Sequence, residues 1–234
     1  MNSIFPREGI LVALALPCDP GGHLLENALA DHLGWLKQRS IHGVLALGST
    51  GEFPLLAVDE RRRVLETVAR LAAPLPVIAN ISDIRPVVVA ELARFARELR
   101  LPGVAVMPPS FFRVSAADQL AFFEFAAEAA QLPVMLYNFP ELTGNRIALE
   151  TMAAFCDRAP MAGIKQSVER VVPRRGRTGA RALLPVRELQ IREPERGHSC
   201  PFENSRFADR SVHAPANSSI RAHPCHPRFV CVSC

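Results

Sequence analysis

Short apolar runs alternate with longer amphipathic stretches over the first 165 residues of this 234-residue chain, and this alternation restricts the fold more than any other feature. The runs are Ile10–Leu16, Gly43–Leu47, Pro76–Asn80, Gly103–Met107, Pro133–Tyr137 and Met161–Lys165. From the second run onward, their first residues stand 27 to 33 residues apart. Runs that are apolar throughout are typical of parallel strands buried on both faces. We therefore predict six β–α units, the last consisting of a strand alone.

The stretches between the runs carry helix patterns. Four apolar residues at steps of four, three and four share one face of an expected helix: Val88, Leu92, Phe95 and Leu99. Pro86 stands where the first residue of that helix is expected. Ser115 and Asp118 resemble a capping box that opens a second helix over residues 116–130.

A doubly wound sheet and a (β/α)8 barrel both fit this alternation. Polar residues follow the C-terminal ends of several different strands: Ser49, Thr50, Glu52, Asn80, Tyr137, Asn138 and Lys165. In a barrel these strand ends meet at one mouth. We therefore predict an α/β fold of the (β/α)8 TIM-barrel type, truncated to about six β/α units and occupying residues 1–170.

The sequence changes character after Arg170. Residues 171–234 show no β–α period and hold seven of the 20 prolines, four of the six cysteines, and eleven arginines against five acidic residues. The part before them is neutral or slightly acidic, so the net charge of +4 predicts no nucleic-acid partner. We predict that residues 171–234 form an irregular, non-homologous tail.

The abrupt change suggests a frameshift or a misplaced gene end near Ser167 to Val172, and a divergent appendage is the alternative. A barrel of six strands would expose the outer edges of its first and sixth strands and much of its apolar interior. We therefore expect the chain to be poorly soluble or inactive. The motif HPCHPRFVCVSC invites a zinc interpretation through Cys225, His226, Cys231 and Cys234, but no second well-spaced pair accompanies it, and we predict no metal.

The composition favours a cytoplasmic enzyme. No run approaches the roughly 18 uninterrupted apolar residues that a membrane span requires. Ile10–Leu16 lacks the small-residue cleavage pattern of a signal peptide. Cys18 and Cys156 are the only cysteines before residue 171, which suits a reduced compartment better than a disulfide scaffold.

Lysine is rare in this chain, which has 25 arginines but only Lys37 and Lys165. Lys165 ends an apolar strand, where loss of solvent disfavours the charged ammonium form. A neutral amine can attack a ketone and form a Schiff base. The alternative is a strand-end lysine whose ammonium group reaches solvent.

Two further features strengthen the chemical interpretation. Tyr137, the single tyrosine, also ends a strand, and a phenol near an amine can carry the protons that Schiff-base chemistry requires. The turn GSTGEF follows another strand, and its hydroxyls and backbone N–H groups suit a carboxylate. Asn80 and Asn138 are expected to be strand-end hydrogen-bonding residues.

The motifs GSTGE, YNFPELTG and GIK, in this order and at these strand ends, resemble the dihydrodipicolinate synthase / N-acetylneuraminate lyase family over residues 8–169. The resemblance implies a pyruvate-handling class I aldolase on a (β/α)8 barrel, commonly tetrameric and without a cofactor. It implies that Lys165 forms the Schiff base with a 2-oxo acid and that Tyr137 carries protons. It further implies that Ser49 joins that relay, while Thr50 with the Gly51 turn holds the pyruvyl carboxylate.

Two departures favour one branch of the resembled family. Synthase members usually carry an arginine where this chain has Leu142, and leucine cannot bind a second carboxylate. Synthases also tend to have a tyrosine pair near the positions of Phe111 and Phe112. The motifs are closer to 2-keto-3-deoxygluconate aldolases, which split a 2-keto-3-deoxy sugar acid into pyruvate and an aldehyde. Dihydrodipicolinate synthase and an inactive remnant or interaction module remain the alternatives.

Overall fold

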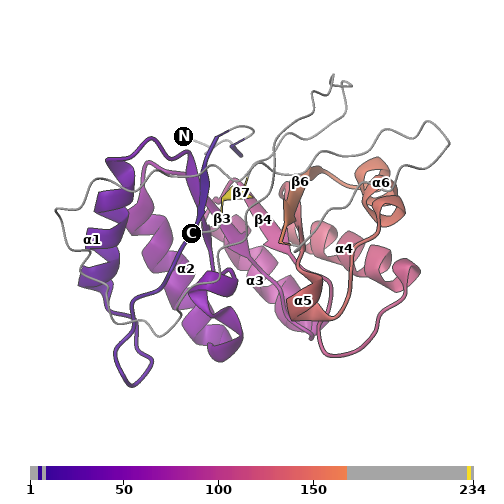
Figure 1. Ribbon diagram of the computed structural model, residues 1–234, viewed down its shortest axis with the longest axis horizontal. Coiled ribbons are helices and arrows are strands. Elements are labelled where there is room, and N and C mark those ends of the chain that lie inside the picture. Colours follow the sequence, from indigo (N-terminus) through magenta and orange to yellow (C-terminus); the bar gives the residue numbers. More distant parts are fainter. Residues whose placement is uncertain (1–4, 7–8, 168–230, 233–234) are drawn as a thin grey trace, which may run out of the picture.

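The computed structural model describes residues 5–6, 9–167 and 231–232, and a parallel sheet forms the centre of this part of the chain (Figure 1). The strands are β1 (Leu11–Ala13), β2 (Gly43–Ala46), β3 (Val77–Asn80), β4 (Gly103–Val106), β5 (Val134–Asn138), β6 (Met161–Gln166) and β7 (Cys231–Val232). They are hydrogen-bonded in the order β6-β5-β4-β3-β2-β1-β7, and all neighbours are parallel. All six predicted strands are present.

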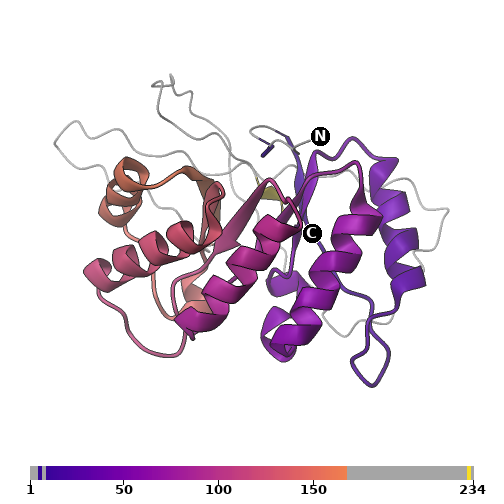
Figure 2. The same ribbon diagram turned by 180° about the vertical axis from the view of Figure 1, so that it is seen from behind.

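Helices connect the strands and cover one side of the sheet. They are α1 (Glu26–Lys37), α2 (Val58–Ala72), α3 (Pro86–Glu98), α4 (Ala116–Ala130), α5 (Pro140–Thr143) and α6 (Leu149–Arg158). Figure 2 shows α1 to α4 side by side on this outer face. Pro86 begins α3 as predicted, and the Ser115 hydroxyl accepts a hydrogen bond from the Asp118 backbone N–H at 3.1 Å. Both predicted helix starts are therefore confirmed.

A contact between β2 and β5 decides between the two sheet types. Ser49 lies three residues beyond the end of β2, and its Oγ lies 2.9 Å from Oη of Tyr137 on β5. β3 and β4 lie between these strands, so a flat sheet would hold them about 14 Å apart. The sheet must therefore curl. Six parallel strands with alternating helices form a half-barrel, as predicted for a truncated TIM barrel, rather than an open doubly wound sheet.

The short strand β7 corrects one expectation. It pairs with β1, with Leu11 opposite Cys231 and Val12 opposite Val232. The expectation that the outer edge of the first strand is unpaired was wrong, because the main chain of residues 231–232 supplies partners to that edge. The rest of residues 171–234, including Cys225, His226 and Cys234 of the zinc alternative, lies outside the described residues.

Within the described part of the chain, no helix combines the length and apolar character needed to cross a membrane. Cys18 and Cys156 are exposed free thiols. The core is built instead from the apolar strands and the inner helix faces, and Leu45, Ile78 and Leu136 are among its fully buried side chains.

Candidate active site

Lys165 and Tyr137 stand directly opposite each other at the carboxyl ends of β6 and β5. The Lys165 Nζ donates a hydrogen bond to the Tyr137 Oη at 2.8 Å. Only 2% of Lys165 and 1% of Tyr137 are exposed. An amine so well shielded from water is held against a phenol, which is the arrangement that the sequence predicted for these two residues.

A β-bulge creates this pairing. Val134 pairs with Met161, but Met135 pairs with Gly163, so Ala162 is an extra residue in β6. If the ladder ran without a bulge and Ala162 paired with Met135, Tyr137 would stand opposite Ile164, and the lysine would point to the other face of the sheet, because side chains alternate along a strand. The one-residue bulge therefore brings the amine and the phenol to the same face. Such a bulge leaves no pattern in the sequence that we could have recognised.

The amine has a second hydrogen-bond partner that the sequence analysis missed. The Lys165 Nζ donates to the Ser167 Oγ at 3.0 Å, and on the other side the Tyr137 Oη is hydrogen-bonded to the Ser49 Oγ at 2.9 Å. Ser49, Tyr137, Lys165 and Ser167 thus form one continuous run of polar groups. The period of two in a strand, which places residues 165 and 167 on one face, is the signal that could have identified Ser167.

The turn after β2 brings Ser49 to this run. It forms the 3-10 turns η1 (Ser49–Gly51) and η2 (Phe53–Leu55), and the Thr50 side chain is exposed. We expected its N–H groups to suit a carboxylate, but the Gly51 N–H is donated to the Gly48 carbonyl at 3.1 Å. A Cβ at Gly51 would lie 3.1 Å from the Leu14 carbonyl oxygen, which explains glycine at this position.

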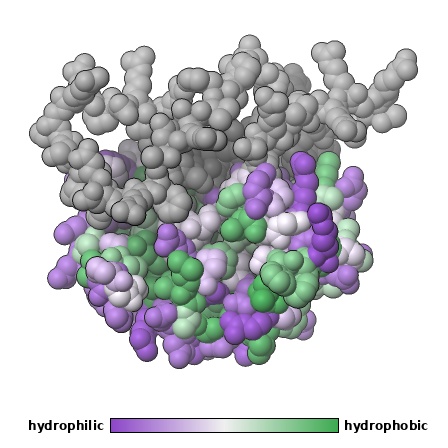
Figure 3. Space-filling model, turned by 60° about the horizontal axis from the view of Figure 1, so that its bottom comes forward, coloured by the Kyte–Doolittle hydropathy of each residue, from purple (hydrophilic) through white to green (hydrophobic). Residues whose placement is uncertain are grey.

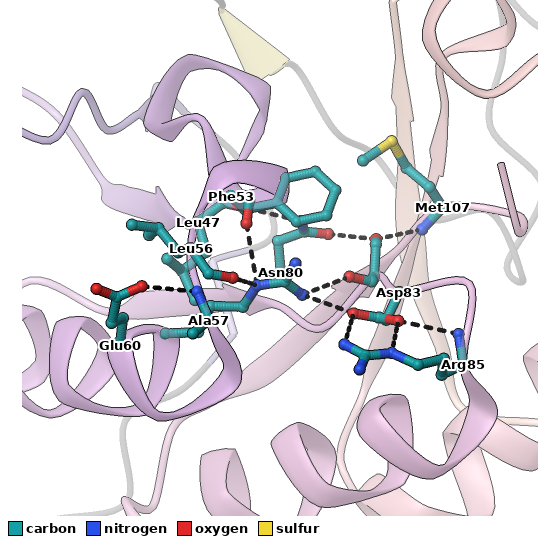
Figure 4. Close-up of polar contacts among 11 residues, drawn as sticks. Leu47, Phe53, Leu56, Ala57, Glu60, Asn80, Asp83, Arg85 and Met107 are labelled. Carbon is teal, nitrogen blue, oxygen red and sulfur yellow. Dashed lines mark hydrogen bonds and ion pairs between the residues drawn. The ribbon is translucent and has the colours of Figure 1, made fainter. Parts of the chain in front are cut away.

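A chain of buried hydrogen bonds links the carboxyl ends of β2, β3 and β4 (Figure 4). The Asn80 side-chain amide donates to the Leu47 carbonyl at 2.6 Å, and the Ser82 hydroxyl donates to Asn80 Oδ1 at 2.6 Å. The Met107 N–H in turn donates to the Ser82 Oγ at 2.8 Å. The prediction that Asn80 is a strand-end hydrogen-bonding residue is confirmed.

The loop after β5 is anchored by two asparagines. Asn138 accepts a hydrogen bond from the Ile147 N–H at 3.0 Å and donates to Gln166 Oε1 at 2.8 Å, so its predicted role is also confirmed. The Asn145 side-chain amide donates to the carbonyls of Pro109 at 2.8 Å and Phe112 at 2.6 Å. These bonds tie the loop after β5 to the loop after β4.

The loops at the carboxyl ends of the strands expose large apolar side chains. Phe111 and Phe112, after β4, pack edge to face with ring centroids 4.8 Å apart, and both are exposed. Leu142 in α5 is exposed as well. Figure 3, which brings the lower side of Figure 1 forward, shows hydrophobic side chains interspersed with hydrophilic ones. None of these three side chains offers a hydroxyl or a charge.

Comparison with known proteins agrees with this arrangement. The model of the dihydrodipicolinate synthetase family matches residues 6–182. The chain belongs to this family. A DapA-like lyase of Halobacterium salinarum is 31% identical over 161 residues, which are 68% of this chain and 53% of that protein. The 4-hydroxy-tetrahydrodipicolinate synthase of Rhizobium meliloti is 29% identical over 166 residues, covering 70% of this chain and 56% of the synthase.

Solved structures confirm the fold. YagE, a prophage protein of the dihydrodipicolinic acid synthase family from E. coli K12, crystallised with pyruvate, matches with a TM-score of 0.67 and 29% identity. That match covers 69% of this chain and 55% of YagE. Structures at 24% identity, named as a synthase, a sialic acid aldolase and a 2-keto 3-deoxygluconate aldolase, share the fold. The chain spans about half the length of the curated relatives it matches.

Proposed function

We propose that the chain contains the Schiff-base site of a carbon–carbon lyase. This lyase splits a 2-keto-3-deoxy sugar acid into pyruvate and an aldehyde, or forms the sugar acid from them. The observation that carries this proposal is the 2.8 Å contact between Nζ of Lys165 and Oη of Tyr137. It joins a buried amine to a proton carrier where the strand ends of a family barrel meet. A surface lysine would have neither the burial nor the partner.

The first stage is formation of the Schiff base. The Lys165 amine attacks the C2 carbonyl of the 2-oxo acid, and the carbonyl oxygen receives a proton through Tyr137. Loss of that oxygen as water leaves an iminium between Nζ and C2. The Ser49 hydroxyl is hydrogen-bonded to Tyr137 and can pass a proton to it. Thr50 with the Gly51 turn holds the pyruvyl carboxylate, through the exposed Thr50 side chain rather than the Gly51 N–H, which is donated to Gly48.

The second stage breaks the carbon–carbon bond. The iminium accepts the electron pair of the C3–C4 bond, the C4 hydroxyl gives its proton to the Tyr137 phenolate, and the aldehyde departs. Protonation of the resulting enamine at C3 and attack of water on C2 release pyruvate and restore the amine. Because the lysine itself supplies the electron sink, the chemistry needs no cofactor.

The apolar character of the mouth supports the aldolase branch. A synthase has to bind the carboxylate of aspartate semialdehyde, but Leu142 offers no charge for this purpose. The second candidate is 4-hydroxy-tetrahydrodipicolinate synthase, which is favoured by the name of the Rhizobium meliloti relative. A third candidate is an inactive remnant or interaction module, which the trapping experiment below distinguishes from an active site.

We further propose residues 1–170 as the barrel domain, followed by a separate tail over 171–234. A cytoplasmic location and a homo-oligomeric assembly, with a 2-oxo acid and an aldehyde as the partners, also belong to this proposal.

Trapping of the Schiff base tests the proposed chemistry. The full chain is incubated with pyruvate and borohydride, and the peptides are analysed by mass spectrometry. We expect a reduced pyruvyl adduct on Lys165 alone. The chain offers a matched control, because Lys37 is the only other lysine and is exposed. Lys37→Met should keep the adduct and Lys165→Met should lose it. A folded chain without the adduct would establish the remnant.

The substrate is tested separately. We expect pyruvate to be released from 2-keto-3-deoxy sugar acids, as measured with a coupled lactate dehydrogenase assay. Consumption of pyruvate with aspartate semialdehyde, in the absence of sugar-acid cleavage, would assign the synthase instead.

A further inference from the structure

Arg61 on α2 is buried beside the segment after β2, where it contacts the carbonyls of Phe53 and Leu56, both labelled in Figure 4. Only 5% of the residue is exposed, although arginine rarely lies inside a protein without paired contacts. Its neighbour Arg62, by contrast, forms a half-exposed ion pair with Glu91. A buried guanidinium so close to a candidate ligand site requires an explanation.

The guanidinium of Arg61 joins two loops at the carboxyl side of the sheet. Its Nε donates to the carbonyls of Phe53 at 3.0 Å and Leu56 at 3.2 Å, both in the segment after β2. Its Nη1 donates to the Ser82 carbonyl at 3.1 Å and to Asp83 Oδ2 at 3.2 Å, both after β3. The planar arrangement of N–H groups in arginine allows one side chain to bind both segments, which a single ammonium group cannot do.

The charge of Arg61 is balanced by Asp83. Burial raises the pKa of the Asp83 carboxyl, but hydrogen bonds from Arg85 and the positive charges of Arg61 and Arg85 outweigh this, so the pKa lies below its usual value. Arg85 donates to Asp83 Oδ1 through its backbone N–H at 2.9 Å and its Nε at 3.0 Å. Asp83 is thus held ionised and aimed at Arg61, and the buried guanidinium has a fixed counter-charge.

The turn is held at both ends. Asn80 binds the Leu47 carbonyl just before it, and Arg61 binds the Phe53 carbonyl just after it. Leu47 and Glu52, which flank the intervening residues, have φ values of 57° and 50°. These left-handed conformations cost of the order of 1 kcal/mol each in residues other than glycine, and they persist only where the surroundings impose them. Asn80 and Arg61 are hydrogen-bonded to the main chain on either side of this turn.

We propose that Arg61 is a positioning residue that fixes the turn of residues 48–52, so that Ser49 reaches Tyr137 and Thr50 faces the carboxylate of the 2-oxo acid. This inference rests on the proposed function for its chemical meaning. Arg61 contacts main-chain carbonyls rather than the amine or the phenol. Its loss should therefore weaken binding of the 2-oxo acid more than it slows chemistry at Lys165.

Hydrogen–deuterium exchange of the full chain tests the structural part of the proposal. Arg61→Met removes all four hydrogen bonds but keeps an unbranched apolar stem. We expect the exchange rates of amides in residues 48–56 to rise about tenfold, while those of β5 and β6 stay unchanged. Arg62→Met is the matched control, since it removes an ion pair between side chains that are each 42% exposed and should leave this segment unchanged.

Borohydride trapping at increasing pyruvate concentration tests the functional part. In Arg61→Met, we expect the half-saturating pyruvate concentration to rise about tenfold, with maximal labelling of Lys165 within about twofold of the wild type. Equal half-saturation in both proteins would overturn the proposal. If the wild type acquires no label, the proposed function fails, whereas the exchange measurement still decides the role of Arg61 in the turn.

Arg61→Lys covers the case in which Arg61→Met does not fold. It keeps the charge but cannot bind both loops, so exchange in residues 48–56 should still exceed that of the wild type. Unchanged protection in Arg61→Lys, or a uniform rise over all strands, would show that Arg61 does not position this turn.

Discussion

The β5–β6 pair and the β2–β4 region hold their functional groups by different means. On β5 and β6, Tyr137 and Lys165 meet because the backbone register, shifted by one bulge, puts them level. Around β2 to β4, the turn that carries Ser49 is shaped by side chains, chiefly Asn80 and Arg61. The comparison indicates that the contact between Tyr137 and Lys165 tolerates changes of neighbouring side chains but not a change in the length of β6. The conformation of the turn that carries Ser49, in contrast, should change when a single supporting side chain is replaced.

Insertion of one alanine between Ile164 and Lys165 should have the largest effect. The inserted residue takes the place opposite Tyr137, and the lysine moves one position along β6, so that its side chain points to the other face of the sheet. We expect complete loss of the pyruvyl adduct on Lys165 in the trapping experiment. Ile164→Ala is the control, because it keeps the chain length and should retain the adduct. Normal labelling of the insertion variant would show that the register does not create the pair.

Tyr137→Phe should slow the chemistry strongly without changing the register. The variant keeps the buried ring but removes the hydroxyl that receives the Lys165 hydrogen bond. Loss of a proton carrier typically costs about a hundredfold or more in rate. We expect adduct formation, followed by rapid-quench trapping, to slow by roughly this factor. An unchanged rate would remove Tyr137 from the proton relay.

Asn80→Ala tests the side-chain control of the turn. It leaves the buried Leu47 carbonyl and Ser82 hydroxyl without their partner, which should lower the free energy of unfolding by about 1–3 kcal/mol. We also expect a higher half-saturating pyruvate concentration. Asn80→Asp accepts the Ser82 hydrogen bond but cannot donate to Leu47, so it separates the two contacts. Wild-type pyruvate binding in both variants would show that Asn80 does not determine the conformation of the turn.

The decrease in the free energy of unfolding at acidic pH provides the smallest and most local test. The pKa of Asp83 is lowered in the folded protein, so this group stabilises the fold above its unfolded pKa of about 3.9, and the contribution disappears as the pH falls through the folded value. Asp83→Asn should therefore show a shallower fall in unfolding free energy between about pH 5 and pH 3. Asp31→Asn, an exposed control on α1, should follow the wild type.

The sequence predicted what depends on local patterns. The strands, the α3 and α4 starts and the strand-end positions of Lys165 and Tyr137 all follow from apolar period, proline and capping residues. The half-barrel could be preferred over a doubly wound sheet only because polar residues followed several strand ends. The structure then decided the question, since a contact such as Ser49 to Tyr137 joins strands that are not neighbours.

The features that the sequence did not predict depend on contacts between residues distant in the chain. The Ala162 bulge changes the register of one strand against another, which no pattern within β6 reveals. In the sequence, Arg61 is one of four consecutive charged residues, Glu60–Arg63. Its guanidinium nevertheless donates hydrogen bonds to carbonyls that are 5 to 21 residues away along the chain. The short pairing of β7 with β1 joins residues from opposite ends of the sequence, beyond the reach of any local rule.

The single tyrosine has a practical consequence. Tyr137 is the only phenol in the chain, and its one indole, Trp35, lies on α1 with the Arg39 guanidinium 3.2 Å above its ring. Any change in ultraviolet absorption caused by ionisation of a phenol therefore comes from Tyr137. This residue contacts the Lys165 amine, on which the Schiff base is proposed to form. A spectrophotometric titration can thus report on this chromophore directly, without a label or a second substrate.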